Sequence, residues 1–259
     1  MTKAGEGERL YVRGLGVDIV IQSDHPAIAR RVRDAWRDAA VESPDSDART
    51  VTVSFEPGAD VHSPDINEIM HTLSPTVTRE VIGAQAGRLV MLHAAALANP
   101  RTGAAAVLVA PSGTGKTTAA MTLGRTLAYL SDETAGITEG GDVLAYRKPL
   151  SVIESPLFKT QRAPSEMGLI TEANAGRLAA LYILERDHEH QGFPVVVALD
   201  TIDALAELAP QVSFLGKFDR PLQRLADLLH RAGGAKRVTY RDAEELAPLL
   251  ARDLGHLTS

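Results

Sequence analysis

A short glycine-rich segment constrains this chain more than any other part of its sequence. Residues 110–118 read Ala-Pro-Ser-Gly-Thr-Gly-Lys-Thr-Thr, after an apolar run at 104–110 and before an Ala-, Thr- and Leu-rich stretch at 117–130. A glycine-rich turn between a strand and a helix lets backbone N–H groups face an anion, and the helix N-terminus adds positive partial charge. The pattern therefore predicts a strand, a phosphate-binding loop and a helix, with a nucleoside triphosphate as the ligand.

The polar residues of this segment have expected roles. Lys116 is placed to reach the β- and γ-phosphates of ATP, and the Thr117 hydroxyl is placed to hold Mg²⁺. The common motif begins with glycine, whereas this chain has Ala110, a mild departure because that position ends the strand. A plain glycine-rich turn is the alternative. The residues predicted to bind the nucleotide are Ser112, Gly113, Thr114, Gly115, Lys116, Thr117 and Thr118.

The composition argues against several classes of protein. A net charge of −6 disfavours a strongly basic nucleic-acid surface, and 4% aromatic residues leave few side chains on which single-stranded bases stack. Because the chain has no cysteine, disulfides and thiolate metal sites are excluded. No apolar run approaches the ~18 residues of a membrane span, and the polar first residues lack a signal-peptide core. We therefore expect a cytoplasmic protein that binds neither nucleic acid nor a membrane.

The first part of the chain, residues 1–88, predicts a small α/β region. Apolar and polar residues alternate in its strand candidates, and apolar residues recur four apart in the first helix candidate. A Gly-Leu-Gly turn indicates that the first two strands form a hairpin. We expect strands at 10–13, 17–21 and 51–55, helices at 26–40 and 76–85, and loops at 42–49 and 57–64.

The remaining residues, 89–259, are expected to form a larger domain of the α/β class around the glycine-rich segment. The apolar run at 88–98 and the run at 104–110 are separated by a turn, which predicts an antiparallel pair. At 259 residues the chain is long enough for one large domain or two small ones. Further strands are expected at 143–147, 178–185, 195–199 and 237–240, and further helices at 203–208, 221–230 and 242–254.

Two adjacent acids, Asp132 and Glu133, follow the glycine-rich segment. They lie 16 and 17 residues beyond Lys116, which leaves room for one helix and one strand, so the pair is expected to return to the nucleotide. One carboxylate, assigned to Asp132 together with Thr117, would hold Mg²⁺. The other would accept a proton from an attacking hydroxyl or orient a water. A polar turn after a buried strand is the alternative.

Several further polar residues are weaker candidates. His93 precedes three alanines on a strand expected beside the glycine-rich segment, where it would contact the γ-phosphate or tune the acid pair. A histidine satisfied within the core fits equally well. Lys159 and Arg162, in an expected polar loop, would stabilise developing phosphoryl charge or be solvated surface charges. His188 and His190 lack a third metal ligand.

Together, these motifs resemble the catalytic domain of HPr kinase/phosphorylase. The resemblance is closer to shorter HPr-kinase-like proteins of bacteria, some of them encoded beside ribosomal-peptide pathways. It covers about residues 89–250, with the strong motifs between 92 and 133. The matching elements are Leu-His-Ala-Ala-Ala-Leu-Ala at 92–98, Ser-Gly-Thr-Gly-Lys-Thr at 112–117 and Tyr-Leu-Ser-Asp-Glu at 129–133, with weaker echoes at 148–151 and 158–164.

The resemblance implies a fold of the P-loop kinase type shared with phosphoenolpyruvate carboxykinases, and a protein that forms oligomers. It also implies transfer of phosphate from ATP to a serine hydroxyl of a protein or peptide, with His93, Lys116, Asp132 and Glu133 as catalytic residues. The family has two aspartates where this chain has Asp132 and Glu133. The glycine-rich capping signature of the bifunctional enzymes is not found, so reverse phosphorylase activity and HPr as substrate are not supported.

Two other functions remain open at this point. The chain fits a nucleotide-dependent binding module that regulates a partner without kinase turnover, a function that Ala110 and Glu133 favour slightly. It also fits a kinase that phosphorylates the hydroxyl of a small molecule. The apolar faces of the last two predicted helices are most simply core packing, and part of either would serve equally as a subunit interface.

Overall fold

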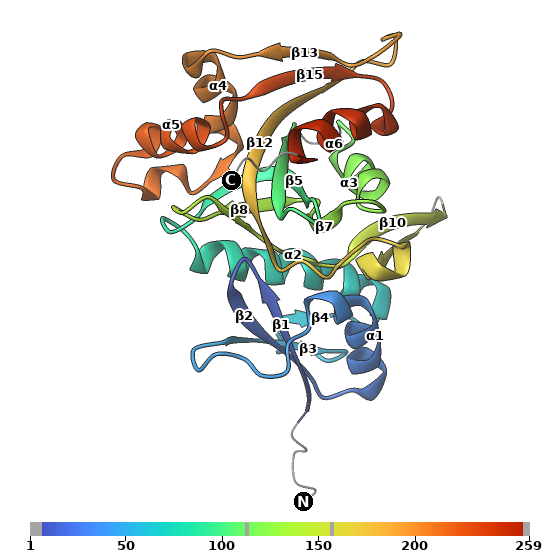
Figure 1. The fold of residues 1–259 in the computed structure, drawn as a ribbon. Helices are drawn as coiled ribbons and strands as arrows, with labels where there is room; N and C mark the ends of the chain where they lie inside the picture. Colours follow the sequence, from blue (N-terminus) through green and yellow to red (C-terminus); the bar gives the residue numbers. More distant parts are fainter. Residues whose placement is uncertain (1–6, 112–113, 156–157, 256–259) are drawn as a thin grey trace, which may run out of the picture. The chain divides into compact units, whose positions relative to one another are not determined.

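The computed structural model describes residues 7–111, 114–155 and 158–255, which divide into two compact units (Figure 1). Unit 1 comprises the chain up to residue 85 together with 147–167, and unit 2 comprises 86–146 and the chain from 168 onwards. The sequence predicts a single boundary at residue 88, whereas the segment 147–167 belongs with the first unit. The roles assigned to the two predicted domains stay a prediction.

A four-stranded sheet with the order β1-β2-β3-β4 forms the centre of unit 1. The first two strands form the predicted antiparallel hairpin, and β2, β3 and β4 run parallel. Both long helices pack on this sheet. The elements are β1 (Glu8–Gly14), β2 (Val17–Ser23), α1 (Pro26–Trp36), a 3₁₀ turn (Arg37–Ala39), β3 (Arg49–Ser54), β4 (Val61–His62), α2 (Ile66–Ala84), β10 (Leu150–Ser155), β11 (Phe158–Arg162) and a 3₁₀ turn (Pro164–Met167).

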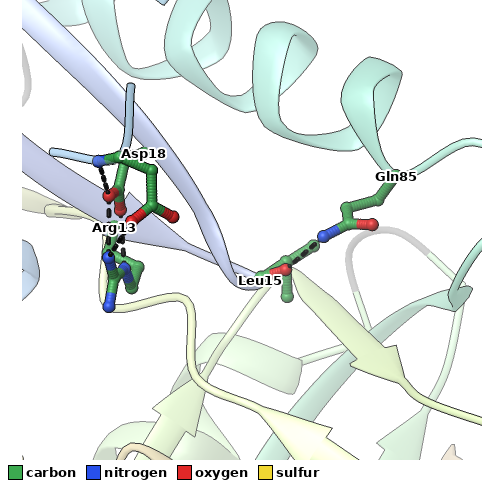
Figure 2. Close-up of polar contacts among 5 residues, drawn as sticks. Arg13, Leu15, Asp18 and Gln85 are labelled. Carbon is green, nitrogen blue, oxygen red and sulfur yellow. Dashed lines mark hydrogen bonds and ion pairs between the residues drawn. The ribbon is translucent and has the colours of Figure 1, made fainter. Parts of the chain in front are cut away.

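Polar contacts fix the turn of the β1–β2 hairpin (Figure 2). Leu15 and Gly16 both have positive φ, at +50° and +74°, as the favoured two-residue hairpin turn requires. The carbonyl of the buried Leu15 accepts a hydrogen bond from Gln85 Nε2 at 2.7 Å. Next to the turn, Arg13 donates Nε and Nη2 to the two oxygens of Asp18, at 2.6 and 2.7 Å. The hairpin is therefore tied both to itself and to the end of α2.

Unit 1 differs from the sequence prediction in three places. Helix α2 begins at Ile66, ten residues before the predicted start, because the Asp65 side chain caps it by accepting from Asn67 N at 2.8 Å. The helix continues through Pro75, which removes one backbone donor without ending it. The expected polar loop of Lys159 and Arg162 is strand β11, which pairs antiparallel with β10. The expected loop at 57–64 contains the short strand β4.

A nine-stranded mixed sheet with the order β13-β15-β12-β6-β5-β8-β9 forms the centre of unit 2, with β7 and β14 also paired to β5. Its elements are β5 (Val90–Ala98), β6 (Ala104–Val109), α3 (Lys116–Leu123), β7 (Ala128–Ser131), β8 (Thr134–Ile137), β9 (Asp142–Leu144), β12 (Ala175–Arg186), β13 (Val195–Ala198), α4 (Thr201–Leu208), a 3₁₀ turn (Ala209–Gln211), β14 (Val212–Ser213), a 3₁₀ turn (Leu215–Lys217), α5 (Pro221–Arg231), β15 (Lys236–Tyr240), η5 (a 3₁₀ turn, Ala243–Leu246) and α6 (Ala247–Gly255).

The middle strands of this sheet are covered on both faces. Strands β5 and β6 form the predicted antiparallel pair, and all residues of β6 are buried. A continuous apolar strand of this kind is typical of a sheet with helices on both sides. Figure 1 shows α3 and α6 on one face of the unit 2 sheet and α4 and α5 on the other. Strand β12 runs parallel to both β6 and β15, so the carboxyl ends of these three strands meet at one edge.

Two predicted helices of unit 2 are shorter in the structure. The expected helix over 117–130 ends at Leu123, and β7 follows at 128–131. The expected helix over 242–254 divides into η5 at 243–246 and α6, with Pro248 in the first turn of α6. Proline lacks the backbone donor that a continuous helix needs there, and it fits the first turn of a new helix.

In the described ranges, no helix is both long enough and apolar enough to cross a membrane.

Candidate functional site

The glycine-rich segment lies where β6 ends and α3 begins, in the strand, loop and helix order that the sequence predicts. Gly115 is the N-cap of α3 and has a left-handed backbone with φ +91°, which glycine adopts without strain. Residues 114–118 are therefore at the start of the helix. The predicted nucleotide-binding residues Ser112 and Gly113 lie outside the described residues. In open α/β sheets, ligands bind at this carboxyl edge of parallel strands.

Lys116 is held against the turn that precedes it. Its side chain is buried, and Nζ donates hydrogen bonds to the carbonyls of Ala110 at 2.6 Å and Pro111 at 3.0 Å. Burial lowers the pKa of the amine, while the nearby Asp132 and Glu133 act in the opposite direction. The amine thus lies at the predicted loop and feels both predicted acids.

Asp132 is fixed by two hydroxyl groups. The Thr117 hydroxyl, in the first turn of α3, donates to Oδ2 at 3.0 Å, and the Tyr129 hydroxyl donates to Oδ1 at 2.9 Å. Tyr129 lies on β7 and is fully buried, which raises its phenol pKa, and the charge of Asp132 raises that pKa further. The structure therefore brings Thr117 and Asp132, the two residues predicted to hold a metal, into direct contact.

Glu133 and His93 lie side by side where β5 pairs with β8. The hydroxyl of the buried Ser131 accepts from Glu133 N at 3.3 Å and from Thr134 N at 3.1 Å, which shapes the turn between β7 and β8. The Glu133 carbonyl accepts from Ala94 N at 3.1 Å, and His93 faces Thr134 in the strand register. Both residues thus lie at the turn between β7 and β8 that carries Asp132 and Glu133.

The four predicted catalytic residues interact through their charges. Burial is the main reason that the pKa of His93 is lowered, and the positive charge of Lys116 lowers it further. Glu133 and Asp132 oppose this shift. The catalytic roles of His93, Lys116, Asp132 and Glu133 remain predictions, although the structure places all four in one electrostatic environment.

Two further residues that the sequence does not predict as site residues reach the glycine-rich segment. Arg186 ends β12 and faces Tyr240 at the end of β15. A Cβ atom built on Gly115 would lie 3.6 Å from Arg186 Nη1 and 3.9 Å from the Tyr240 hydroxyl. The Tyr240 hydroxyl lies 3.5 Å from the Thr114 carbonyl, at the upper limit for a hydrogen bond. The available sequence signal was that Arg186 directly follows the apolar run predicted as a strand.

The other polar candidates belong to other elements of the chain. Lys159 and Arg162 lie on β11 in unit 1, and Arg162 forms an ion pair with Glu166 at 2.7 Å. A contact of either residue with phosphate stays a prediction. A ring nitrogen of His190 lies 2.9 Å from the Phe193 carbonyl. Among the described residues there is no group of three or more His, Asp or Glu side chains placed to hold a metal ion.

The comparisons with known proteins do not define a family for this chain. No protein-family model and no curated protein matches the sequence. Among solved structures, the HPr(Ser) kinase/phosphatase from Coxiella burnetii matches 64% of this chain and 93% of its own, with 11% sequence identity and a TM-score of 0.31. A similarity of this size carries no argument about the fold or the activity of this chain.

Proposed function

We propose that this protein is an ATP- and Mg²⁺-dependent kinase that transfers the γ-phosphate to a serine hydroxyl of a protein or peptide. The observation that carries the proposal is the contact between the Thr117 hydroxyl and the Asp132 carboxylate. Thr117 directly follows Lys116, the first residue of α3. A hydroxyl and a carboxylate in contact beside a lysine form the arrangement that a magnesium–nucleotide complex needs.

The residues present fit a magnesium ion. Mg²⁺ prefers oxygen ligands and is usually held by one or two protein groups together with phosphates and water. Thr117 Oγ1 and Asp132 Oδ2 are 3.0 Å apart and would both face the ion, while Tyr129 holds the other carboxylate oxygen. When bound, Mg²⁺ would neutralise charge on the β- and γ-phosphates.

The start of α3 fits the phosphates. Its first backbone N–H groups have no partner inside the helix, and the helix dipole favours an anion there. The buried amine of Lys116 donates to the carbonyls of Ala110 and Pro111, and it would exchange these contacts for a phosphate oxygen. The cost of burying the amine would then be offset by a full negative charge.

Glu133 is the residue that we assign as the base. The hydroxyl groups of Thr117 and Tyr129 hold the Asp132 carboxylate in place beside Thr117, so we assign Asp132 to the metal. In the transfer, the acceptor hydroxyl oxygen bonds to the γ-phosphorus and its proton passes to Glu133. The bond from that phosphorus to the bridging oxygen of ADP breaks. Glu133 is longer by one methylene than the aspartate of the resembling family, so the assignment is tested together with Asp132, the other candidate base.

The acceptor class rests on the sequence resemblance. The motifs at 92–98, 112–117 and 129–133 resemble those of kinases that act on a serine of a protein, and some similar short proteins are encoded beside ribosomal-peptide pathways. A small-molecule kinase and a nucleotide-gated binding module without turnover are the outcomes that the test must separate.

The test is a transfer experiment with separate acceptor pools. The wild-type protein and Lys116→Ala are incubated with Mg-ATP and the small proteins and peptides encoded beside the gene, and in parallel with free hydroxy amino acids and sugars. The proposal requires a phosphate on a serine of a protein or peptide, made only by the wild type. Phosphate on a free small molecule would point to the second class. Mg-ATP binding without any transfer would point to the binding module.

A further inference from the structure

Arg186 brings a second cation to the start of α3. It occupies the last position of β12, whose parallel neighbour β6 leads into the glycine-rich segment. Its Nη1 lies 3.6 Å from the point where a Cβ atom of Gly115 would be. The guanidinium therefore lies within contact distance of the N-cap of the helix.

One edge of the Arg186 guanidinium is anchored by the chain that follows β15. Nε donates to the Arg241 carbonyl at 2.9 Å, and Nη2 lies 3.8 Å from Asp242 Oδ1, beyond hydrogen-bond distance. Within the described ranges, Nη1 makes no hydrogen bond that satisfies the usual geometry. The side chain is 31% exposed. The anchored edge therefore sets the direction of the group, and the other edge faces the α3 start.

The position of this charge is unfavourable without an anion. A cation near a helix N-terminus opposes the helix dipole, and here the amine of Lys116 lies at the same helix end. Among the described residues, Asp242 is the carboxylate within ion-pair distance of Arg186, and at 3.8 Å the attraction is weak and partly screened. A phosphate group at the α3 start would satisfy both cations and the helix dipole together.

We propose that Arg186 binds a phosphate group of the nucleotide, as a second cationic residue beside Lys116. This inference rests on the proposed function, because it concerns the same nucleotide site. Nη1 donates a charge-assisted hydrogen bond to a phosphate oxygen, and the anchored Nε keeps the guanidinium in place. Tyr240, next to Arg186 in the sheet, is a positioning residue that supports the Thr114 end of the segment.

The experiment measures ligand affinity by calorimetry, with Mg-ATP and adenosine as two separate probes. The variants are Arg186→Ala, Arg186→Lys and the control Arg101→Ala, which removes the same charge from the exposed turn at the opposite end of β6. Losing a charge-assisted hydrogen bond at a partly exposed position weakens binding by about tenfold. We expect that loss for Arg186→Ala with Mg-ATP, a smaller loss for Arg186→Lys, and no change for Arg101→Ala.

The outcomes separate this inference from the proposed function. If the wild type does not bind Mg-ATP, the proposed function fails and this inference fails with it. If the wild type binds and Arg186→Ala binds equally well, only the inference is overturned. An equal loss for adenosine and Mg-ATP would place the guanidinium on the base or sugar and would also overturn it. Circular dichroism shows whether each variant is folded, and Arg186→Lys provides the comparison if Arg186→Ala is not.

Discussion

The buried hydroxyl of Tyr129 donates a hydrogen bond to Asp132 Oδ1 at 2.9 Å, and so joins β7 to the candidate site. Tyr129→Phe removes this donor and keeps the ring. Because a hydrogen bond to a buried carboxylate contributes about 1.5–3 kcal/mol, we expect a decrease of that size in the free energy of unfolding. Urea unfolding monitored by circular dichroism gives the value.

A double-mutant cycle assigns this loss to the contact with Asp132. In the background of Asp132→Asn, Tyr129→Phe should cost clearly less, since the acceptor no longer carries a charge. Tyr11→Phe, at a partly exposed position of unit 1, controls for the loss of a tyrosine hydroxyl. Equal costs of Tyr129→Phe in both backgrounds would contradict the account.

The local order of the candidate site was predictable from the sequence. The run at 104–109 is wholly apolar and becomes a strand buried on both faces, and glycines follow it before the helix that starts at Lys116. The spacing from Lys116 to Asp132 leaves room for one short helix and one strand, and the structure has both. Each of these steps depends on residues that are close in sequence.

The positions of Arg186 and Tyr240 were not predictable in the same way. They reach Gly115 only because β12 pairs with β6 and β15 pairs with β12. Strand order is set by side-chain packing between distant segments, and no local pattern records it. The same holds for the segment 147–167. It belongs with unit 1, although strands β5 to β9 of the unit 2 sheet precede it in the sequence.

The second prediction concerns the close packing around Gly176. A Cβ atom at this position of β12 would lie 2.8 Å from Ala105 Cβ and 2.9 Å from Ala98 Cβ, both fully buried. Gly176→Ala should therefore destabilise the protein by about 1–3 kcal/mol, as overpacking of a core does. Chemical denaturation of purified protein measures this change.

Gly83→Ala is the matched control for that substitution. Gly83 lies in α2, and a Cβ atom there would have no neighbour within 4 Å. Alanine in place of glycine in a helix stabilises by up to about 1 kcal/mol, so the two substitutions should have opposite signs. A Gly176→Ala variant as stable as the wild type would show that β12 does not approach Ala98 and Ala105 this closely.

The pH dependence of stability should include a contribution from Asp253 on α6. Burial alone would raise the pKa of this carboxyl, but hydrogen bonds from Arg252, Lys236 and Tyr182 lower it to about 2. Since the ordinary value is 3.8, Asp253 contributes stability that is fully present above pH 3.8 and is lost as the pH falls to about 2. The shift corresponds to roughly 2 kcal/mol.

Asp253→Asn tests this contribution. At pH 7 the variant should be less stable than the wild type by about 2 kcal/mol, and the difference should shrink as the pH falls from 4 toward 2. Asp227→Asn, at a charged surface position of α5, is the control. A difference that stays constant over this pH range would contradict the assignment of the low pKa to Asp253.

The most direct test of the proposed nucleotide site is the magnesium dependence of ATP binding in Thr117→Val. The variant keeps the shape of the side chain and removes the hydroxyl that contacts Asp132, and Thr122→Val on the same helix is the matched control. We predict that wild type and Thr122→Val bind ATP more tightly with Mg²⁺ than without it, whereas Thr117→Val loses about tenfold of this gain. A magnesium gain in Thr117→Val equal to that of the wild type would contradict the account.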